Sequence, residues 1–238
     1  MTFSQREIIR SLRLECFSAM REARDIPSDD HLVWYAGYGS NLLGARFDWY
    51  ISGGTPAGSA KAYAGCRDRS APRGDRPVML PHQLYFADHS DSWGGAIAFI
   101  GRAASAATTY ARMYLITYGQ FNDVVRQENG RRVPGDVIVP PYEDLARSAE
   151  WLIAGFRLYG RMMKIGMEDG HPILTFTATR DDFVVGPPSD AYIRMIAAGL
   201  REAWPSLDTA GVLDYLMQAE GIRRAIAPER VGQWISRP

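Results

Sequence analysis

The first hydrophobic pattern in the chain has the period of a helix. Ser4 stands before it and Glu7 follows three residues later, which is the spacing of a capping box. Pro27 and the polar residues after it end the pattern. We therefore predict an amphipathic helix from Ser4 to Arg24, whose apolar face consists of Ile8, Ile9, Leu12, Cys16, Phe17 and Met20.

Further along the chain, short apolar runs predict strands and longer periodic runs predict helices. Strands are expected at 31–38, 83–86, 95–100, 112–117 and 173–179, and helices at 42–51, 118–127, 190–203 and 207–218. Residues 55–82 show little periodicity and are predicted to be loops with a weak strand, and the tail after the last helix is expected to end loosely. Strands and helices mix without a βαβ rhythm, which argues against a doubly wound fold.

The composition limits the classes of molecule that the chain is expected to bind. The 27 basic and 27 acidic residues cancel, so the chain gains no long-range attraction to nucleic acid or to anionic lipid. No run of about 18 uncharged apolar residues occurs, and charges such as Arg6 and Arg10 interrupt any signal peptide, so we expect no membrane span and a cytoplasmic protein. Cys16 and Cys66 are predicted to be buried thiols, with a single disulfide as the alternative.

Neither a metal site nor a cofactor site is predicted. His31, His82, His89 and His171 lack the spacing of known zinc motifs, and the acidic residues near His82 and His89 are better explained by a polar loop. The run 37–42 lacks the third glycine of a dinucleotide fingerprint and the Gly-Lys-Ser/Thr ending of a phosphate loop.

The same run, 37–42, follows a predicted buried strand and precedes a predicted helix. Glycine there removes a side chain where a ligand could come close. The amides that follow would point together and favour an anion or a polarised carbonyl, although a plain tight turn would have the same sequence.

Four motifs in order resemble one family. Residues 38–42 read Tyr-Gly-Ser-Asn-Leu, the signature of the γ-glutamylcyclotransferase-like superfamily, which includes γ-glutamylamine cyclotransferases and plant avirulence-induced proteins. Arg46 suits the continuation of this signature, and residues 93–96, Trp-Gly-Gly-Ala, resemble the family's strand entry. The run 121–130 resembles the helix that ends in the family's catalytic glutamate, and 187–192 with Gly199 and Glu202 resembles its terminal helix. The resemblance covers residues 32–205.

The resemblance implies an α+β fold, a small mixed β-barrel or curled sheet with flanking helices. It implies a catalytic domain at 31–205. Outside the resemblance we expect an N-terminal helical extension at 1–30, which covers a sheet edge or builds a homodimer, and a helical tail at 206–238. The implied activity closes a γ-glutamyl group of a small molecule into 5-oxoproline and releases the attached amine, without a metal or cofactor. Glu128 is the implied proton shuttle, and the implied substrate-binding residues are Tyr35, Ala36, Gly37, Tyr38, Gly39, Ser40, Asn41 and Tyr192.

Two departures from the family pattern bear on these expectations. Asn129 separates Glu128 from Gly130, which affects the pose of the carboxylate, and Phe176 replaces an expected Tyr, which affects the choice of substrate. A binding module without turnover and a γ-glutamyl amide hydrolase remain alternatives. The leaving group is expected to contact loops in 55–82 and 130–150.

Overall fold

The computed structural model describes residues 28–55 and 62–236. The predicted helix at Ser4–Arg24 and Cys16 lie outside these ranges. Cys66 lies inside them, where it carries a buried free thiol.

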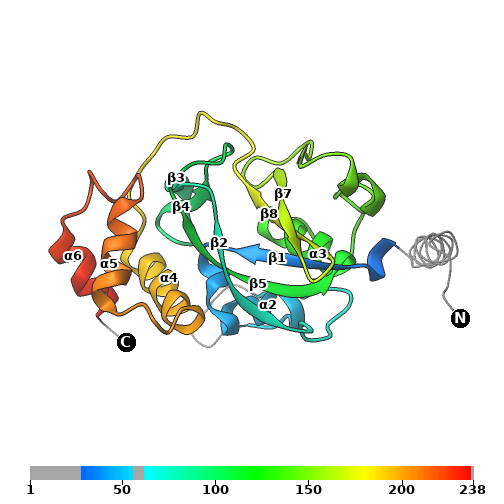
Figure 1. The fold of residues 1–238 in the computed structure, drawn as a ribbon, viewed down its shortest axis with the longest axis horizontal. Coiled ribbons are helices and arrows are strands. Elements are labelled where there is room, and N and C mark those ends of the chain that lie inside the picture. Colours follow the sequence, from blue (N-terminus) through cyan, green and yellow to red (C-terminus); the bar gives the residue numbers. More distant parts are fainter. Residues whose placement is uncertain (1–27, 56–61, 237–238) are drawn as a thin grey trace, which may run out of the picture.

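A six-stranded mixed sheet forms the centre of the molecule (Figure 1). Its strand order is β2-β5-β1-β8-β7-β6, and β1 pairs antiparallel with β5 and parallel with β8. The strands span β1 Leu32–Gly37, β2 Asp75–Leu80, β5 Thr109–Thr117, β6 Glu150–Leu152, β7 Arg161–Glu168 and β8 His171–Thr177. A separate antiparallel hairpin consists of β3 Leu84–Ser90 and β4 Gly95–Ile100.

The expected α+β class is confirmed, and the sheet is open rather than a closed barrel in the described part of the chain. β2 and β6 form its two edges. The helices are α2 Gly44–Ser52, α3 Tyr118–Glu128, α4 Asp190–Ala203, α5 Thr209–Gln218 and α6 Pro228–Ile235, and the 3-10 turns are η1 Ser28–Asp30, η2 Ser40–Leu42 and η3 Tyr142–Ala146. None of the helices in the described ranges combines the length and apolar character that a bilayer-spanning segment needs.

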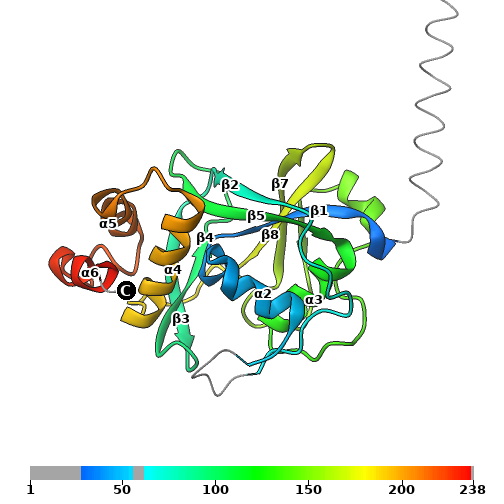
Figure 2. The ribbon, with the colours of Figure 1, turned by 90° about the horizontal axis from the view of Figure 1, so that it is seen from below.

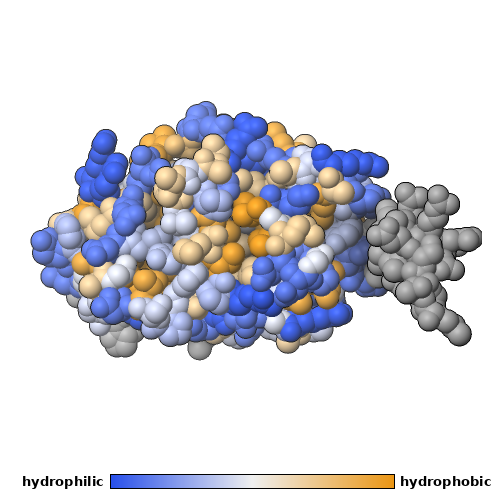
Figure 3. Space-filling view, in the orientation of Figure 1, coloured by the Kyte–Doolittle hydropathy of each residue, from blue (hydrophilic) through white to orange (hydrophobic). Residues whose placement is uncertain are grey.

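Alternation along β1 separates two hydrophobic cores. Trp34 and Ala36 belong to the core shared with β3, β4, α4, α5 and α6, whereas Val33 and Tyr35 belong to the core shared with α2 and α3. The three C-terminal helices lie together at one end of the molecule (Figures 1 and 2). On the face drawn in Figure 3, apolar residues gather near the middle and hydrophilic residues surround them.

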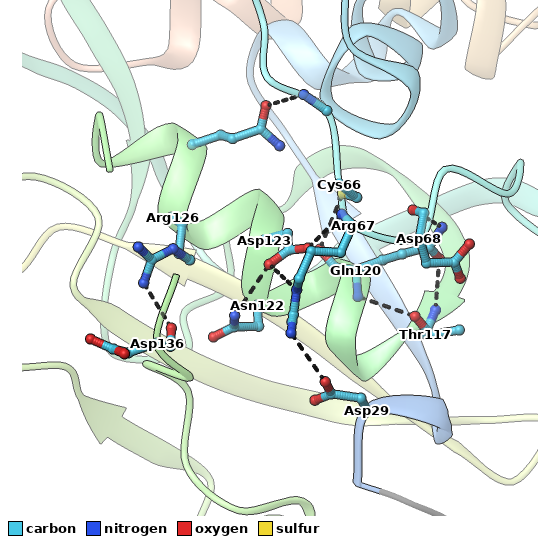
Figure 4. Close-up of polar contacts among 12 residues, drawn as sticks. Asp29, Cys66, Arg67, Asp68, Thr117, Gln120, Asn122, Asp123, Arg126 and Asp136 are labelled. Atoms are coloured by element: carbon cyan, nitrogen blue, oxygen red, sulfur yellow. Dashed lines mark hydrogen bonds and ion pairs between the residues drawn. The ribbon is translucent and has the colours of Figure 1, made fainter. Parts of the chain in front are cut away.

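Buried polar side chains fix α3 to the loops beside it (Figure 4). Thr117 and Gln120 form a capping box at its start. Asp123, 1% exposed, accepts hydrogen bonds from the backbone N–H of Arg67 at 2.9 Å and from its Nε at 3.0 Å. On the other side, Arg126 donates to the carbonyl oxygen of Asp136 at 2.7 Å. A buried carboxylate without partners would be costly, so these contacts restrain the helix whose last residue is Glu128.

α4 approaches η2 very closely. Ser189 caps α4 as predicted, and its hydroxyl accepts from the backbone N–H of Tyr192 at 3.2 Å. At Gly199 an added Cβ would lie 2.4 Å from the backbone nitrogen of Leu43, so only glycine permits this contact. The close packing brings Tyr192, in the first turn of α4, to the loop after β1.

Several elements differ from the prediction. β7 and β6 were not predicted, because β7 mixes charged residues with methionines and is irregular near Gly166. The segment 55–82 was predicted as loops with a weak strand, and β2 is a strand within it whose position was not predicted; its side chains are mostly exposed, so they carry little apolar pattern. The tail does not end loosely, since α6 buries Val231 and Ile235 in the core that contains α4.

Candidate functional site

A cavity of about 300 Å³ lies where the loop after β1 meets the end of α3, the turn between β3 and β4, and the start of α4. Of the residues predicted to form the site, six line it: Tyr35, Tyr38, Gly39, Ser40, Glu128 and Tyr192. Its other walls consist of Arg46, Tyr50, Ser90, Ser92, Trp93, Ile97, Ala98, Gln127, Asn129, Gly130, Leu158, Tyr159 and Phe176.

Three predicted residues lie behind the wall. The carbonyl oxygen of Ala36 accepts a hydrogen bond from the Thr175 hydroxyl at 2.8 Å, and Gly37 is paired with Arg112 in the sheet. Asn41 is 3% exposed and reaches the site through its neighbours.

The Asn41 side chain joins the loop after β1 to the end of α3. Its Nδ2 donates to Glu128 Oε1 at 2.7 Å and to the Tyr35 hydroxyl at 3.0 Å. Its Oδ1 is buried and has no hydrogen-bond partner in the described ranges. Glu128 is half-buried on the cavity wall, and the bond from Asn41 orients one carboxylate oxygen.

Gly39 is required for space rather than for a left-handed backbone, because its φ is −105°. A Cβ at this position would lie 2.9 Å from the Tyr192 hydroxyl. That hydroxyl accepts from the backbone N–H of Ala98 at 3.3 Å. Tyr192 is thereby held against the turn that carries the family signature.

The tyrosine hydroxyls around the cavity stay protonated at neutral pH. Burial raises the pKa of Tyr35 well above its ordinary value, and the negative charge of Glu128 raises it further. Burial also raises the pKa of Tyr192, against the hydrogen bonds that its oxygen accepts from the backbone of Ala98 and Ser40. The hydroxyls of Tyr35 and Tyr192 can therefore donate a hydrogen bond to a ligand.

The two departures from the family pattern have definite contacts. Asn129 Nδ2 donates to the carbonyl oxygens of Val125 at 2.9 Å and Tyr159 at 3.0 Å, and Asn129 Oδ1 accepts from the backbone N–H of Tyr159 at 3.1 Å. Phe176 stacks on Tyr35 with ring centroids 5.3 Å apart. Asn129 thus fixes a loop that lines the cavity, and Phe176 supports a tyrosine that faces it.

Sequence reasoning missed much of the cavity rim. The leaving group was expected to contact loops in 55–82 and 130–150, but within the described ranges Gly130 is the one member of those loops that lines the cavity. The rim comes instead from the turn at Ser90–Trp93 and from Leu158 and Tyr159. The sequence singled out Arg46 as part of the continuation of the signature, but only the structure shows that it lines the cavity.

No group of three His, Cys, Asp or Glu side chains in the part of the chain that the structure describes is arranged to hold a metal ion. His82, one of the residues considered for such a site, is buried, and its Nδ1 lies 2.8 Å from the carbonyl oxygen of Gly101. This contact gives the buried imidazole a polar partner within the protein, so its burial needs no bound metal as an explanation.

Comparison with known sequences gives one relative, and its name is not that of the family whose motifs the sequence resembles. No protein-family model matches the chain. Over 188 residues the chain is 36% identical to histone deacetylase 5 of Arabidopsis thaliana, a match that covers 71% of this chain and 28% of the plant protein. The chain therefore spans less than a third of that relative, whose name describes the whole plant protein.

Comparison with solved structures returns matches that include proteins named as γ-glutamyl cyclotransferases. The chain is similar to a γ-glutamyl cyclotransferase at 16% identity and a TM-score of 0.47, over 86% of this chain and 98% of that one. It is similar to an uncharacterised protein from Homo sapiens at 16% identity and a TM-score of 0.48, over 87% and 100% of the two chains. A glutathione-specific γ-glutamyl cyclotransferase from yeast gives 12% identity and a TM-score of 0.31, over 87% and 96%.

Proposed function

We propose that this protein is a γ-glutamyl cyclotransferase that releases 5-oxoproline and a free amine from a γ-glutamyl amide. The observation that carries the proposal is the 2.7 Å hydrogen bond between Asn41 and Glu128. It joins two motifs 87 residues apart in the sequence and holds a carboxylate on the wall of the cavity that the signature loop lines.

The reaction needs a proton acceptor close to the substrate's α-amine. This amine is mostly ammonium at neutral pH, and it attacks the γ-carbonyl of the same molecule only after losing a proton. Glu128 takes that proton and later gives it to the departing amine. The C–N bond of the new five-membered ring forms as the amide C–N bond breaks, so no co-reactant is consumed.

The cavity supports this chemistry by orientation and by hydrogen bonding. Because the attack is intramolecular, holding the substrate folded contributes a part of the about 7–11 kcal/mol that full orientation of two reacting groups supplies. The Tyr192 hydroxyl and the backbone N–H of Gly39, two residues that line the cavity, would donate to the carbonyl oxygen as it becomes negative.

The test is a panel of γ-glutamyl amides with different leaving amines, assayed for 5-oxoproline and for free glutamate. The proposal predicts 5-oxoproline and amine in equal amounts. Release of glutamate instead would identify a hydrolase. Binding of 5-oxoproline without turnover of any amide would identify a binding module of the same fold.

A further inference from the structure

We infer that Arg46 binds the α-carboxylate of the glutamyl group, an inference that rests on the proposed function. Arg46 lies on α2, and its guanidinium forms part of the cavity wall.

Aromatic rings and tyrosine hydroxyls hold the guanidinium of Arg46 in place. It lies over the rings of Tyr63, Tyr50 and Trp93, at 4.7, 5.3 and 5.5 Å from their centroids. One Nη donates to the Tyr63 hydroxyl, and the other lies 3.5 Å from that of Tyr50. Among the described residues, Arg46 forms no ion pair and its buried Nε has no hydrogen-bond partner. The aromatic rings therefore fix a guanidinium that forms no direct ion pair with a carboxylate in the described ranges.

The charges of the cavity match those of an amino-acid head group. In the described ranges, Arg46 and Glu128 are the two charged side chains on the wall. A γ-glutamyl amide carries one ammonium and one carboxylate on its α-carbon. If Glu128 receives the ammonium proton, the carboxylate is best placed at Arg46, because a guanidinium binds a carboxylate through two parallel hydrogen bonds.

This assignment also gives each hydrogen-bond donor of the site a separate group of the substrate to bind. With the α-carboxylate on Arg46, the Gly39 N–H and the Tyr192 hydroxyl stay available to the γ-carbonyl oxygen. Arg46 has two alternative roles, which the experiment below distinguishes. It could be structural and only stack on the rings, or it could bind a carboxylate on the leaving group.

The experiment compares Arg46→Gln with the unchanged protein on two substrates that share one leaving amine. One is a γ-glutamyl amide, and the other is the corresponding 4-aminobutanamide, which lacks the α-carboxylate and would cyclise to 2-pyrrolidinone. The leaving amine carries no carboxylate. We expect kcat/KM for the γ-glutamyl amide to fall about 10²-fold, mainly through KM, because a charge-assisted bidentate contact is lost. The rate on the 4-aminobutanamide should stay within about 3-fold, and Arg46→Lys should restore part of the loss.

A matched control is Arg230→Gln, since Arg230 also lies over an aromatic ring, 5.2 Å from the centroid of Trp234, but away from the cavity. An equal loss on both substrates for Arg46→Gln would overturn the inference in favour of a structural role. So would a loss seen only when the leaving group carries a carboxylate.

Direct binding separates this inference from the proposed function. Titration of 5-oxoproline and of 2-pyrrolidinone, followed by NMR, needs no turnover. If the protein turns over no amide but binds 5-oxoproline in an Arg46-dependent way, the carboxylate site stands and the proposed function fails. Turnover with Arg46-independent binding of 5-oxoproline would leave the proposed function standing and overturn the carboxylate site.

Discussion

Among single residues, the contact between Gly39 and Tyr192 decides the shape of the signature loop. Gly39→Ala places a methyl group 2.9 Å from the Tyr192 hydroxyl, so the loop and the tyrosine must separate. We expect binding of 5-oxoproline to weaken about 10-fold or more, with a loss of stability of about 1–3 kcal/mol from overpacking. Calorimetric titration and thermal melting of one preparation measure both.

The matched second change is Tyr192→Phe in the Gly39→Ala background. Removing the hydroxyl makes room for the methyl group, so the double variant should recover most of the stability that the single variant loses. If Gly39→Ala binds 5-oxoproline normally, the loop is only a connection between β1 and α2.

Between elements, Asn129 joins the end of α3 to the loop that carries Tyr159. Its three hydrogen bonds involve Val125 and the backbone of Tyr159. The Tyr159 hydroxyl in turn donates to the carbonyl oxygen of Ala98 at 3.0 Å. The inserted residue therefore supports the cavity rim rather than contacting the reacting atoms.

Asn129→Ala should raise KM about 10-fold, since the two bonds to Tyr159 contribute about 0.5–1.5 kcal/mol each. The value of kcat should change little, because Asn41 and not Asn129 orients Glu128. Steady-state kinetics on two amides of different leaving group provide the measurement. Tyr159→Phe keeps the ring and the backbone clamp and serves as the control. A fall in kcat with unchanged KM would contradict this view of Asn129.

The elements that could be predicted are those whose own sequence specifies them. α4 has a serine cap and an apolar stripe, and β4 is an unbroken apolar run, so both were found. β7 and α6 were missed because their stability depends on β8 and on the C-terminal core. The signature loop is contiguous and so was visible, whereas Arg46 and Tyr159 reach the cavity only through the packing of α2 and of a loop without periodic pattern.

Across the whole molecule, α5 and α6 contribute to the core of the fold. Val212, Leu216, Val231 and Ile235 are buried in the same cluster as α4. Ending the chain at residue 205 would expose this surface, so we expect the truncated chain to lose cooperative thermal unfolding or to aggregate. A truncated chain that melts like the full one would instead support the tail as a separate extension, as the sequence suggested.

Alkaline pH should destabilise the protein. Burial raises the pKa of Tyr35, Tyr38, Tyr50, Tyr159 and Tyr192 above the ordinary value of 10.0. Above about pH 10 these groups lose protons in the unfolded chain but keep them in the native one, so the free energy of unfolding falls as pH rises. Urea unfolding at pH 8 and at pH 10.5 measures the change. Native tyrosines that titrate near 10 by absorbance would contradict it.

The most direct test of the proposed activity is Glu128→Gln. The change keeps the size of the side chain, and its amide oxygen can still accept from Asn41, but it cannot take a proton from the α-ammonium. We predict that the variant melts within a few degrees of the unchanged protein, still binds 5-oxoproline, and releases 5-oxoproline from a γ-glutamyl amide about 10²–10⁴-fold more slowly. Near-normal turnover by Glu128→Gln would contradict the assignment of Glu128 as the proton shuttle.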